Sequence, residues 1–488
     1  MLAIKSKKCY DNNRGKRRLG GMKMKILIVS YVDDNFGDNL IRICFEQLLR
    51  VVLRNLGLSE NECQIEKMPL KSIDADLVAG ADIIFFAGGG LFGMSYLNFF
   101  PFLDSITKLA DEKGIPVVFS SIGINNMNAT ADGEQALKTI LRRKCIKAVS
   151  VRENLDFFKT YAKGCDFRIE SVCDPAVWTQ YIYHLRATRK TRTIGINVVR
   201  GGLFKDNQKD WGMTDELRYL DDLRKRLEAD GFSCIFYTNG SVLDNNTLHY
   251  FAREYKIPEQ NLVYPQTTRE VVETVAGFEA VATFRMHSSI IAYAFGIPSV
   301  ALVWNDKIPF FYDSIGHPER ALVFENWDAK IVFEQITAIL EAKETEKLDP
   351  EYLMSLYNFL YRTLLEQCEK AQDTPAYTFE TVAAALAADA KRIEKEDTFD
   401  LRVKLEKAEK HYLARFTELR RKDGEIRKYQ REIEARKKEC DRCREDLRLC
   451  REQMQAQKET LQKQKEELDG LNRMLAVRVC RRLKRKTK

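Results

Sequence analysis

The chain has no apolar run that approaches the roughly 18 to 20 residues that a membrane-spanning helix needs. Its first 25 residues contain nine Lys or Arg and no apolar core, so we expect no secretory signal there. Met22 and Met24 directly precede the first apolar run, and we expect translation to start there, with residues 1–23 as a disordered basic leader. A chain of 488 residues without a signal is expected in the cytoplasm, with reduced thiols.

Metal-ligand spacing is missing as well. The twelve cysteines are scattered, and most lie in apolar patterns, where a free thiol behaves as a small hydrophobe. Cys440-x-x-Cys443 lies in a helical repeat and has no second pair at zinc spacing. The sequence therefore predicts no metal centre.

The body of the chain has no basic excess, although the net charge is +8. Residues 396–488 hold 29 basic and 19 acidic side chains, and the first 25 hold nine and one. The remaining body holds 41 basic and 51 acidic side chains. Any anion site in the body must therefore be a local cluster, and we expect no nucleic-acid partner.

Short apolar runs alternate with helical stripes through most of the chain, which is typical of α/β domains with parallel strands. The first run covers residues 26–31. Residues 183–192 are polar and basic and predict a linker, after which the pattern restarts. The sequence predicts two doubly wound Rossmann-like domains, residues 24–185 and 193–345, followed by packing helices over residues 346–395.

One predicted turn contains two residues that are suited to binding an anion and moving a proton. Residues 280–284 predict a buried strand, and the apolar run that ends at Gly296 predicts a helix, so Arg285 and His287 lie between them. Open α/β sheets bind ligands at such places, and free N–H groups at a helix start favour an anion. Arg adds a permanent cation, and His titrates near neutral pH. This pattern predicts an anion site with a proton-transfer group, or else a surface turn with a structural Arg and a capping His.

Two glycine-containing loops follow the first strands. Asn35-x-Gly37-Asp38 leads into a predicted helix, for which Asp38 is the expected N-cap. Gly88-Gly89-Gly90 ends a strand, where glycines allow either a close approach to ligand or a tight turn.

Arg285-x-His287-Ser288, followed by a small-residue helix and Gly296-Ile297-Pro298, resembles the signature of the polysaccharide pyruvyl transferase family. The resemblance covers residues 24–345, because further blocks agree in the same chain order: Asn35-x-Gly37-Asp38, Gly88-Gly89-Gly90, Val151-Arg152-Glu153, Asp174-Pro175-Ala176 and Trp304-x-x-Lys307.

The resemblance implies a GT-B-like pair of domains and an enzyme. Family members transfer the pyruvyl group of phosphoenolpyruvate onto a sugar of a cell-surface glycan or its precursor as a ketal. The implied catalytic residues are His287, Arg285 and Asp38. The implied substrate-binding residues are Asn35, Gly37, Gly88, Gly89, Gly90, Arg152, Asp174, Arg200, Ser288 and Lys307. Phosphoenolpyruvate is the donor substrate, and no cofactor or metal is expected.

This chemistry requires a site that holds a carboxylate and a phosphate and moves a proton. By resemblance Arg285 holds the anion, with Lys307 as a second cation. His287 is expected to act as base on the sugar hydroxyl or as acid on the leaving phosphate. Asp38 and Asp174 are alternative acids for the methylene carbon. Arg152 is expected to contact ligand or to pair with a nearby carboxylate.

Two other classes remain open. A GT-B glycosyltransferase would use a sugar nucleotide and would need a carboxylate for the ribose, but the residues after Pro298 are apolar until Asp306. A non-catalytic scaffold would leave Arg285 and His287 unexplained.

Residues 396–476 predict a coiled coil and a homo-oligomer, with a single solvated helix as the alternative. Apolar side chains recur there every seven residues. The column consists of Leu405, Tyr412, Leu419, Ile426, Ile433, Cys440, Leu447, Met454, Leu461, Leu468 and Leu475. The companion seam is mostly polar. Residues 477–488 form a basic tail without an acid, which predicts peripheral contact with the inner face of an anionic membrane or a solvated end.

Overall fold

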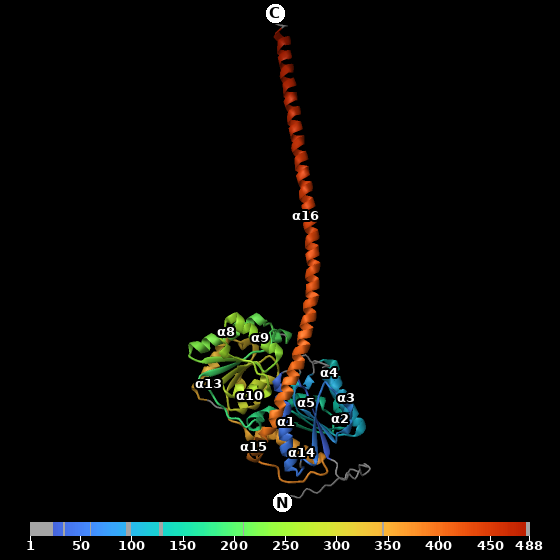
Figure 1. The fold of residues 1–488 in the computed structure, drawn as a ribbon, viewed down its shortest axis with the longest axis vertical. Coiled ribbons are helices and arrows are strands. Elements are labelled where there is room, and N and C mark those ends of the chain that lie inside the picture. Colours follow the sequence, from blue (N-terminus) through green and yellow to red (C-terminus); the bar gives the residue numbers. More distant parts are fainter. Residues whose placement is uncertain are drawn as a thin grey trace. The chain divides into compact units, whose positions relative to one another are not determined.

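The computed structural model describes residues 23–484 apart from residues 33–34, 59, 94–98, 126–129, 208 and 344–345. The expected leader lies outside the described residues except for Lys23, and so do residues 485–488 of the tail. Contacts divide the chain into one unit that ends at Ala408 and a second unit from Glu409 to Lys488. The first unit contains two parallel sheets of six strands with their helices (Figure 1), which confirms the prediction of two α/β halves.

The first sheet has the order β2-β1-β3-β5-β7-β8, and all of these pairings are parallel. Its strands are β1 (Met24–Ser30), β2 (Cys63–Pro69), β3 (Ile83–Ala87), β5 (Val117–Ile122), β7 (Ile146–Val151) and β8 (Arg168–Ser171). Ile26 and Ile28 belong to one core cluster, whereas Leu27 and Val29 belong to another. Because successive side chains point to opposite faces, both faces of the sheet are buried.

The helices of this half are α1 (Phe36–Asn55), α2 (Ala75–Gly80), α3 (Phe100–Lys113), α4 (Ala131–Leu141), α5 (Leu155–Tyr161) and α6 (Thr179–Ile182). A two-stranded pairing of β4 (Phe92–Gly93) with β6 (Ile124–Asn125) and the 3-10 helix η1 (Pro175–Trp178) complete it. Seventeen of the 20 residues of α1 are buried. The helix is therefore an internal support rather than a surface element.

The second sheet has the order β11-β10-β9-β12-β13-β14, again all parallel. Its strands are β9 (Thr193–Asn197), β10 (Ser233–Tyr237), β11 (Leu262–Val263), β12 (Ala280–Thr283), β13 (Ser299–Leu302) and β14 (Ala321–Leu322). Its helices are α7 (Leu203–Asp206), α8 (Met213–Ala229), α9 (Val242–Tyr255), α10 (Thr268–Ala276), α11 (Met286–Ala294), α12 (Lys307–Ser314) and α13 (Ala329–Glu341). The short 3-10 helices η2 (Glu259–Asn261), η3 (Pro318–Arg320) and η4 (Phe324–Asn326) lie between them.

The two halves meet where α1 begins. Phe36 N donates a hydrogen bond to Asn239 O at 3.0 Å, which joins α1 to the loop after β10. A Cβ at Gly240 would lie 2.2 Å from the Phe36 ring, so only glycine fits against that ring. The loops that follow the strands of both sheets therefore contact each other here.

Two later helices pack on the first half. They are α14 (Pro350–Gln367) and α15 (Phe379–Ala388). The helix α14 also contacts the second half, where Ser314 Oγ donates to Tyr352 OH at 3.2 Å. Trp178 Nε1 donates to Leu353 O at 3.1 Å, and Arg168 forms an ion pair with Glu366 at 2.5 Å. Both contacts tie α14 to the end of the first half. The 3-10 helix η5 (Ala390–Lys395) follows α15.

The chain ends in α16 (Glu396–Lys484), a helix of 89 residues that includes nearly all of the second unit. Lys404, near its start, donates to Pro265 O at 2.8 Å and lies over the Phe36 ring. Among the described helices, none combines the length and the apolarity needed to cross a membrane.

Candidate functional site

Each sheet has one point at which its strand order reverses, and the loops there carry predicted site residues. In the first sheet this point lies between β1 and β3, whose following loops hold Asn35, Gly37 and residues 88–90. In the second sheet it lies between β9 and β12, whose loops hold Arg200 and Arg285. Open α/β sheets bind ligands at such points, outside the carboxyl ends of the strands.

The first loop ends in the cap of α1, and the cap is Asn35. Asn35 Oδ1 accepts a hydrogen bond from Gly37 N at 3.3 Å, and Asn35 Nδ2 donates to Asp38 Oδ2 at 3.3 Å. The prediction that Asp38 is the N-cap is therefore wrong, because Asp38 lies in the first turn of the helix. A carboxylate in that turn is stabilised by the positive end of the helix dipole.

Gly37 lies directly against His287. A Cβ at Gly37 would be 2.3 Å from His287 Nδ1, a distance that no real side chain allows. His287 is the second residue of α11, and Arg285 supplies the N-cap of that helix through its extended backbone. The contact brings the start of α1, in the first half, against the start of α11, in the second half.

His287 is buried and neutral. Burial, together with the charges of Arg152, Lys307 and Arg285, lowers its pKa to about 4, against the opposing effect of Asp174. His287 Nε2 lies 3.9 Å from Asp174 Oδ2 and has no hydrogen-bond partner among the described residues. One ring nitrogen thus stands beside a carboxylate with its hydrogen-bonding capacity unused.

Arg152 is held by two carboxylates. Its Nε donates to Glu153 Oε2 at 2.9 Å, and its Nη1 donates to Asp174 Oδ2. Asp174 Oδ1 also accepts from Ala176 N at 2.8 Å, and Glu153 Oε1 accepts from Ile124 N at 3.0 Å. Of the two expected roles of Arg152, the structure contains the ion pair. The bonds fix the orientation of Asp174 beside His287.

Lys307 reaches the same place from α12. A Cβ at Gly90 would lie 2.3 Å from Lys307 Nζ, so the ammonium rests against the glycine loop. Gly88 and Gly89 have φ of 61° and 76°, left-handed values that favour glycine. Burial lowers the pKa of Lys307, and Arg152 lowers it further, while Glu153 raises it. No hydrogen bond or ion pair engages Lys307 Nζ within the described residues.

Arg285, in contrast, is paired with a buried carboxylate, although its Nε has no hydrogen-bond partner among the described residues. Arg285 Nη2 donates to both oxygens of Asp244, each at 2.7 Å, and Asp244 is inaccessible to solvent. Asp244 Oδ1 also accepts from Arg200 N at 2.8 Å. Burial raises the pKa of Asp244, and Arg285 opposes that shift. The Arg200 side chain is itself paired with Asp206 at 2.6 Å.

Glu216 of α8 lies near this group. Burial raises the pKa of Glu216 well above its usual range, and the negative charge of Asp244 adds to the shift. Burial thus favours the neutral form of Glu216, and the carboxylate that hydrogen-bonds Arg285 is Asp244.

Ser288 faces the interior. It is inaccessible to solvent, and its Oγ donates to Asn239 Oδ1 at 2.9 Å. Asn197 Nδ2 donates to the same oxygen at 3.0 Å. Ser288 thus orders the loop after β10, which carries Asn239 and contacts Phe36.

Two groups of residues result, and the predicted site is divided between them. We call His287, Asp174, Arg152, Glu153 and Lys307 the His287 cluster; Gly37, Asp38 and Gly90 adjoin it. We call Arg285, Asp244, Arg200 and Glu216 the Arg285 cluster. The sequence did not single out Glu153, Asp244 or Glu216 as site residues. Glu153 could have been found as a partner of Arg152, because it is the next residue in the chain. Asp244 could have been considered because it lies at the start of the helix that follows β10.

Within the described ranges, no group of three or more His, Cys, Asp or Glu side chains is arranged to hold a metal ion.

The fold and the two clusters define a class: a protein of two parallel α/β halves whose loops bring charged side chains together where the halves meet. The family model described as polysaccharide pyruvyl transferase matches residues 25–306. The match covers more than half of the chain, so this protein belongs to the polysaccharide pyruvyl transferase family. No curated protein matches the chain in sequence.

Solved structures with a similar fold include two epimerases. A putative UDP-N-acetylglucosamine 2-epimerase from Listeria monocytogenes has 10% identity, covers 72% of this chain and 100% of its own, and has a TM-score of 0.48. The UDP-GlcNAc 2-epimerase from Methanocaldococcus jannaschii, in complex with UDP-GlcNAc and UDP, has 11% identity, coverage of 71% and 100%, and a TM-score of 0.45.

The ADP-heptose lps heptosyltransferase II from E. coli has 14% identity, coverage of 66% and 99%, and a TM-score of 0.34. Each TM-score lies below 0.5, so these likenesses carry no conclusion about the activity of this chain.

Proposed function

We propose that this protein transfers the pyruvyl group of phosphoenolpyruvate onto a sugar of a cell-surface glycan or its precursor, as a ketal. The observation that carries the proposal is the neutral, buried His287 with a free ring nitrogen, enclosed by the family's own motif residues. Phosphoenolpyruvate serves as donor substrate, and the reaction needs no cofactor or metal.

The donor presents a carboxylate and a phosphate on a small carbon frame. Lys307 binds one of these anions, because its ammonium has no described partner and rests against the glycine loop. The N–H groups at the start of α11 add an anion-binding helix end. Arg285, already bound to Asp244, shapes this end of α11 and contributes positive potential rather than a free guanidinium.

His287 acts as the general base on the attacking sugar hydroxyl. Burial and the cations Arg152 and Lys307 keep its pKa low. A bound anionic donor offsets these charges, so the pKa of His287 rises when the donor is in place. The imidazole then takes the hydroxyl proton, and Asp174 stabilises the resulting cation from 3.9 Å.

The methylene carbon of the donor needs a proton when the hydroxyl oxygen bonds to the neighbouring carbon. Asp174 is occupied by Arg152 and the N–H of Ala176 and lies beside His287. We therefore assign the step to Asp38, at the start of α1, with Asp174 as the alternative. A second sugar hydroxyl then replaces the phosphate, its proton leaves with the phosphate, and the ketal ring closes.

The test incubates the purified full chain with phosphoenolpyruvate and glycan acceptors, and measures phosphate release together with acceptor mass. The expected result is phosphate release that depends on acceptor, with an acceptor heavier by one pyruvyl ketal. Release of a nucleoside diphosphate from a sugar nucleotide, with no use of phosphoenolpyruvate, would instead make the protein a glycosyltransferase. If the folded chain turns over neither donor, the non-catalytic scaffold is the class that remains.

We further propose that α16 forms a coiled coil with a second copy of this chain. The heptad column is solvent-exposed in the single chain; Leu405, Leu419, Leu461 and Leu468 are each more than half exposed. A regular apolar column of this length is covered when two such helices pair. The partly polar companion seam makes the expected dimer only moderately stable.

The basic tail, residues 477–488, is proposed to hold the dimer at the inner, cytoplasmic face of an anionic membrane. Each basic residue near such a surface contributes about 1 kcal/mol, and a dimer presents two tails.

A further inference from the structure

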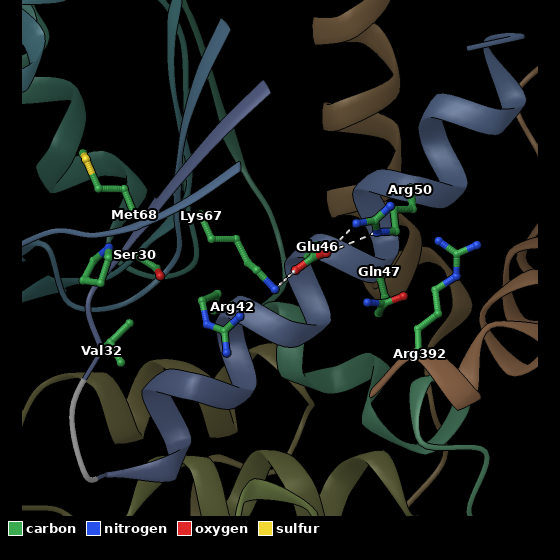
Figure 2. A pocket seen from close by; sticks show the side chains of 10 residues that line it. Ser30, Val32, Arg42, Glu46, Gln47, Arg50, Lys67, Met68 and Arg392 are labelled. Atoms are coloured by element: carbon green, nitrogen blue, oxygen red, sulfur yellow. Dashed lines mark hydrogen bonds and ion pairs between the residues drawn. The ribbon is translucent and has the colours of Figure 1, made fainter. Parts of the chain in front are cut away.

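A polar cavity of about 380 Å³ lies between the edge strand β2 and the middle of α1 (Figure 2). Its volume is within the range of small-molecule sites. It is separate from the His287 cluster, since its α1 residues begin at Arg42, one helical turn after Asp38, and continue to Arg50. The reaction proposed above makes no use of it.

The cavity is lined by four cations and one carboxylate. Arg42 and Arg50 come from α1, Lys67 from β2 and Arg392 from η5, and Glu46 is the single acid of the lining. Glu46 is itself engaged: Lys67 Nζ lies 3.1 Å from its Oε2, and Arg50 Nη2 donates to its Oε1 at 2.7 Å (Figure 2). One carboxylate serves two of the cations, so the cations of the lining outnumber its acids.

Acids outside the lining pair with some of these cations. Arg392 pairs with Glu60, which also lies 3.7 Å from Arg50, and Arg392 Nε lies 3.8 Å from Asp389 Oδ1. The side chains of Arg392 and Glu60 are 41% and 57% exposed, and solvent screens such pairs. Arg42, at 3% exposed, is the buried arginine of the lining.

The rest of the lining suits a sugar. Ser30 Oγ and Gln47 Oε1 line the cavity, are buried, and have no hydrogen-bond partner within the described part of the chain. Buried polar atoms of this kind are normally satisfied, so they match the hydroxyls of a ligand. Val32, Met68 and Pro69 add apolar surface of the kind that packs against the C–H face of a pyranose.

We propose that this cavity binds a phosphorylated monosaccharide. Its phosphate lies among Arg42, Lys67 and Arg392, and its hydroxyls satisfy Ser30 and Gln47. Phosphoenolpyruvate does not fit this pattern, because it has no hydroxyl group. The proposal stands independently of pyruvyl transfer, since it concerns binding and different residues.

Glucose 1-phosphate is the probe, and calorimetric titration of the full chain is the measurement. The expected result is saturable binding, with glucose and inorganic phosphate each binding at least about tenfold more weakly, because each makes only part of the contacts. Lys67→Gln and Arg392→Gln change exposed side chains and should each weaken binding several-fold. Arg226→Gln is the matched control, since Arg226 is an exposed arginine paired with Asp222 on α8.

Three results would overturn the proposal. The first is the absence of saturable binding of glucose 1-phosphate by the folded chain. The second is unchanged binding in the Lys67→Gln/Arg392→Gln double variant. The third is loss of binding in Lys307→Gln with unchanged binding in the double variant, which would move the ligand to the His287 cluster. Inorganic phosphate that binds as tightly as the sugar phosphate would overturn the sugar assignment.

Discussion

The two arginine-containing clusters differ in which charges they pair. In the Arg285 cluster, Arg285 Nη2 binds both oxygens of a fully buried Asp244, although Arg285 Nε and both Glu216 carboxyl oxygens have no hydrogen-bond partner among the described residues. In the His287 cluster, Arg152 is paired with Glu153 and Asp174, but Lys307 Nζ and His287 Nε2 have no hydrogen-bond partner among the described residues. A cation paired with a buried carboxylate stabilises the fold, whereas a cation without an ion pair can bind an anion. We therefore expect Arg285 to act mainly in stability, and Lys307 and His287 in binding and chemistry.

The largest effect is expected from Arg285→Ala. Removing one partner of a buried ion pair leaves Asp244 uncompensated, which costs about 3–5 kcal/mol of folding stability. Denaturant unfolding measures this loss. In an Arg285→Leu/Asp244→Leu double variant much of the stability should return. An Arg285→Ala variant as stable as the wild type, with weakened donor binding, would place Arg285 with the ligand-binding residues instead.

The pH dependence of stability sharpens the comparison for His287. Its pKa of about 4 in the folded protein lies below the unfolded value near 6.5, so the unfolded chain binds more protons between these values. Its contribution is fully present above about pH 6.5 and is lost as the pH falls towards 4, by at most about 3 kcal/mol. The slope of unfolding free energy against pH in this window should decrease in His287→Gln. An identical slope would mean that His287 is not buried as a neutral ring.

Catalysis should separate His287 from Arg285. His287→Gln removes the proposed base and should lower turnover by about 10² or more, with a smaller effect on donor binding. Steady-state kinetics with phosphoenolpyruvate and an accepted glycan measure both effects. Near-normal turnover in the folded variant would make His287 a packing partner of Gly37 only.

Lys307→Gln tests whether the cation without an ion pair binds the donor. Loss of a charge-assisted contact costs about 1.5–3 kcal/mol, which is about tenfold or more in phosphoenolpyruvate affinity. Thermal stability should change little, because no ion pair engages Lys307 within the described residues. The matched comparison is Lys330→Gln, an exposed lysine of α13 whose loss should leave affinity unchanged.

The smallest effect on the clusters is expected from truncation after Ala408. Both clusters belong to the unit that ends there, and the truncated chain keeps the contact between Lys404 and Pro265. Donor binding should therefore persist while molecular mass and binding to anionic liposomes fall. If the full chain is already a monomer and does not sediment with liposomes, α16 has another partner.

The sequence determined the strand and the helix on either side of Arg285, because apolar runs of buried strands and helices are local patterns. It placed His287 in the turn, whereas His287 is the second residue of α11. It also determined the two α/β halves and the long terminal helix. It did not reveal β2, an edge strand in which Gln64, Glu66 and Lys67 interrupt the apolar pattern. The N-cap of α1 was also misplaced, because Asn35 and Asp38 are both good capping residues and only the backbone angles distinguish them.

Only the tertiary structure decided which charges are available. Arg285 and Lys307 look alike in the sequence, each in a loop after a strand of the second half. Asp244, 41 residues before Arg285, binds the guanidinium, whereas Lys307 rests against Gly90 and forms no ion pair with any carboxylate that the structure describes. Charge pairing acts over a few ångströms in space and is indifferent to distance along the chain, so residue type and spacing alone could not separate the two cations.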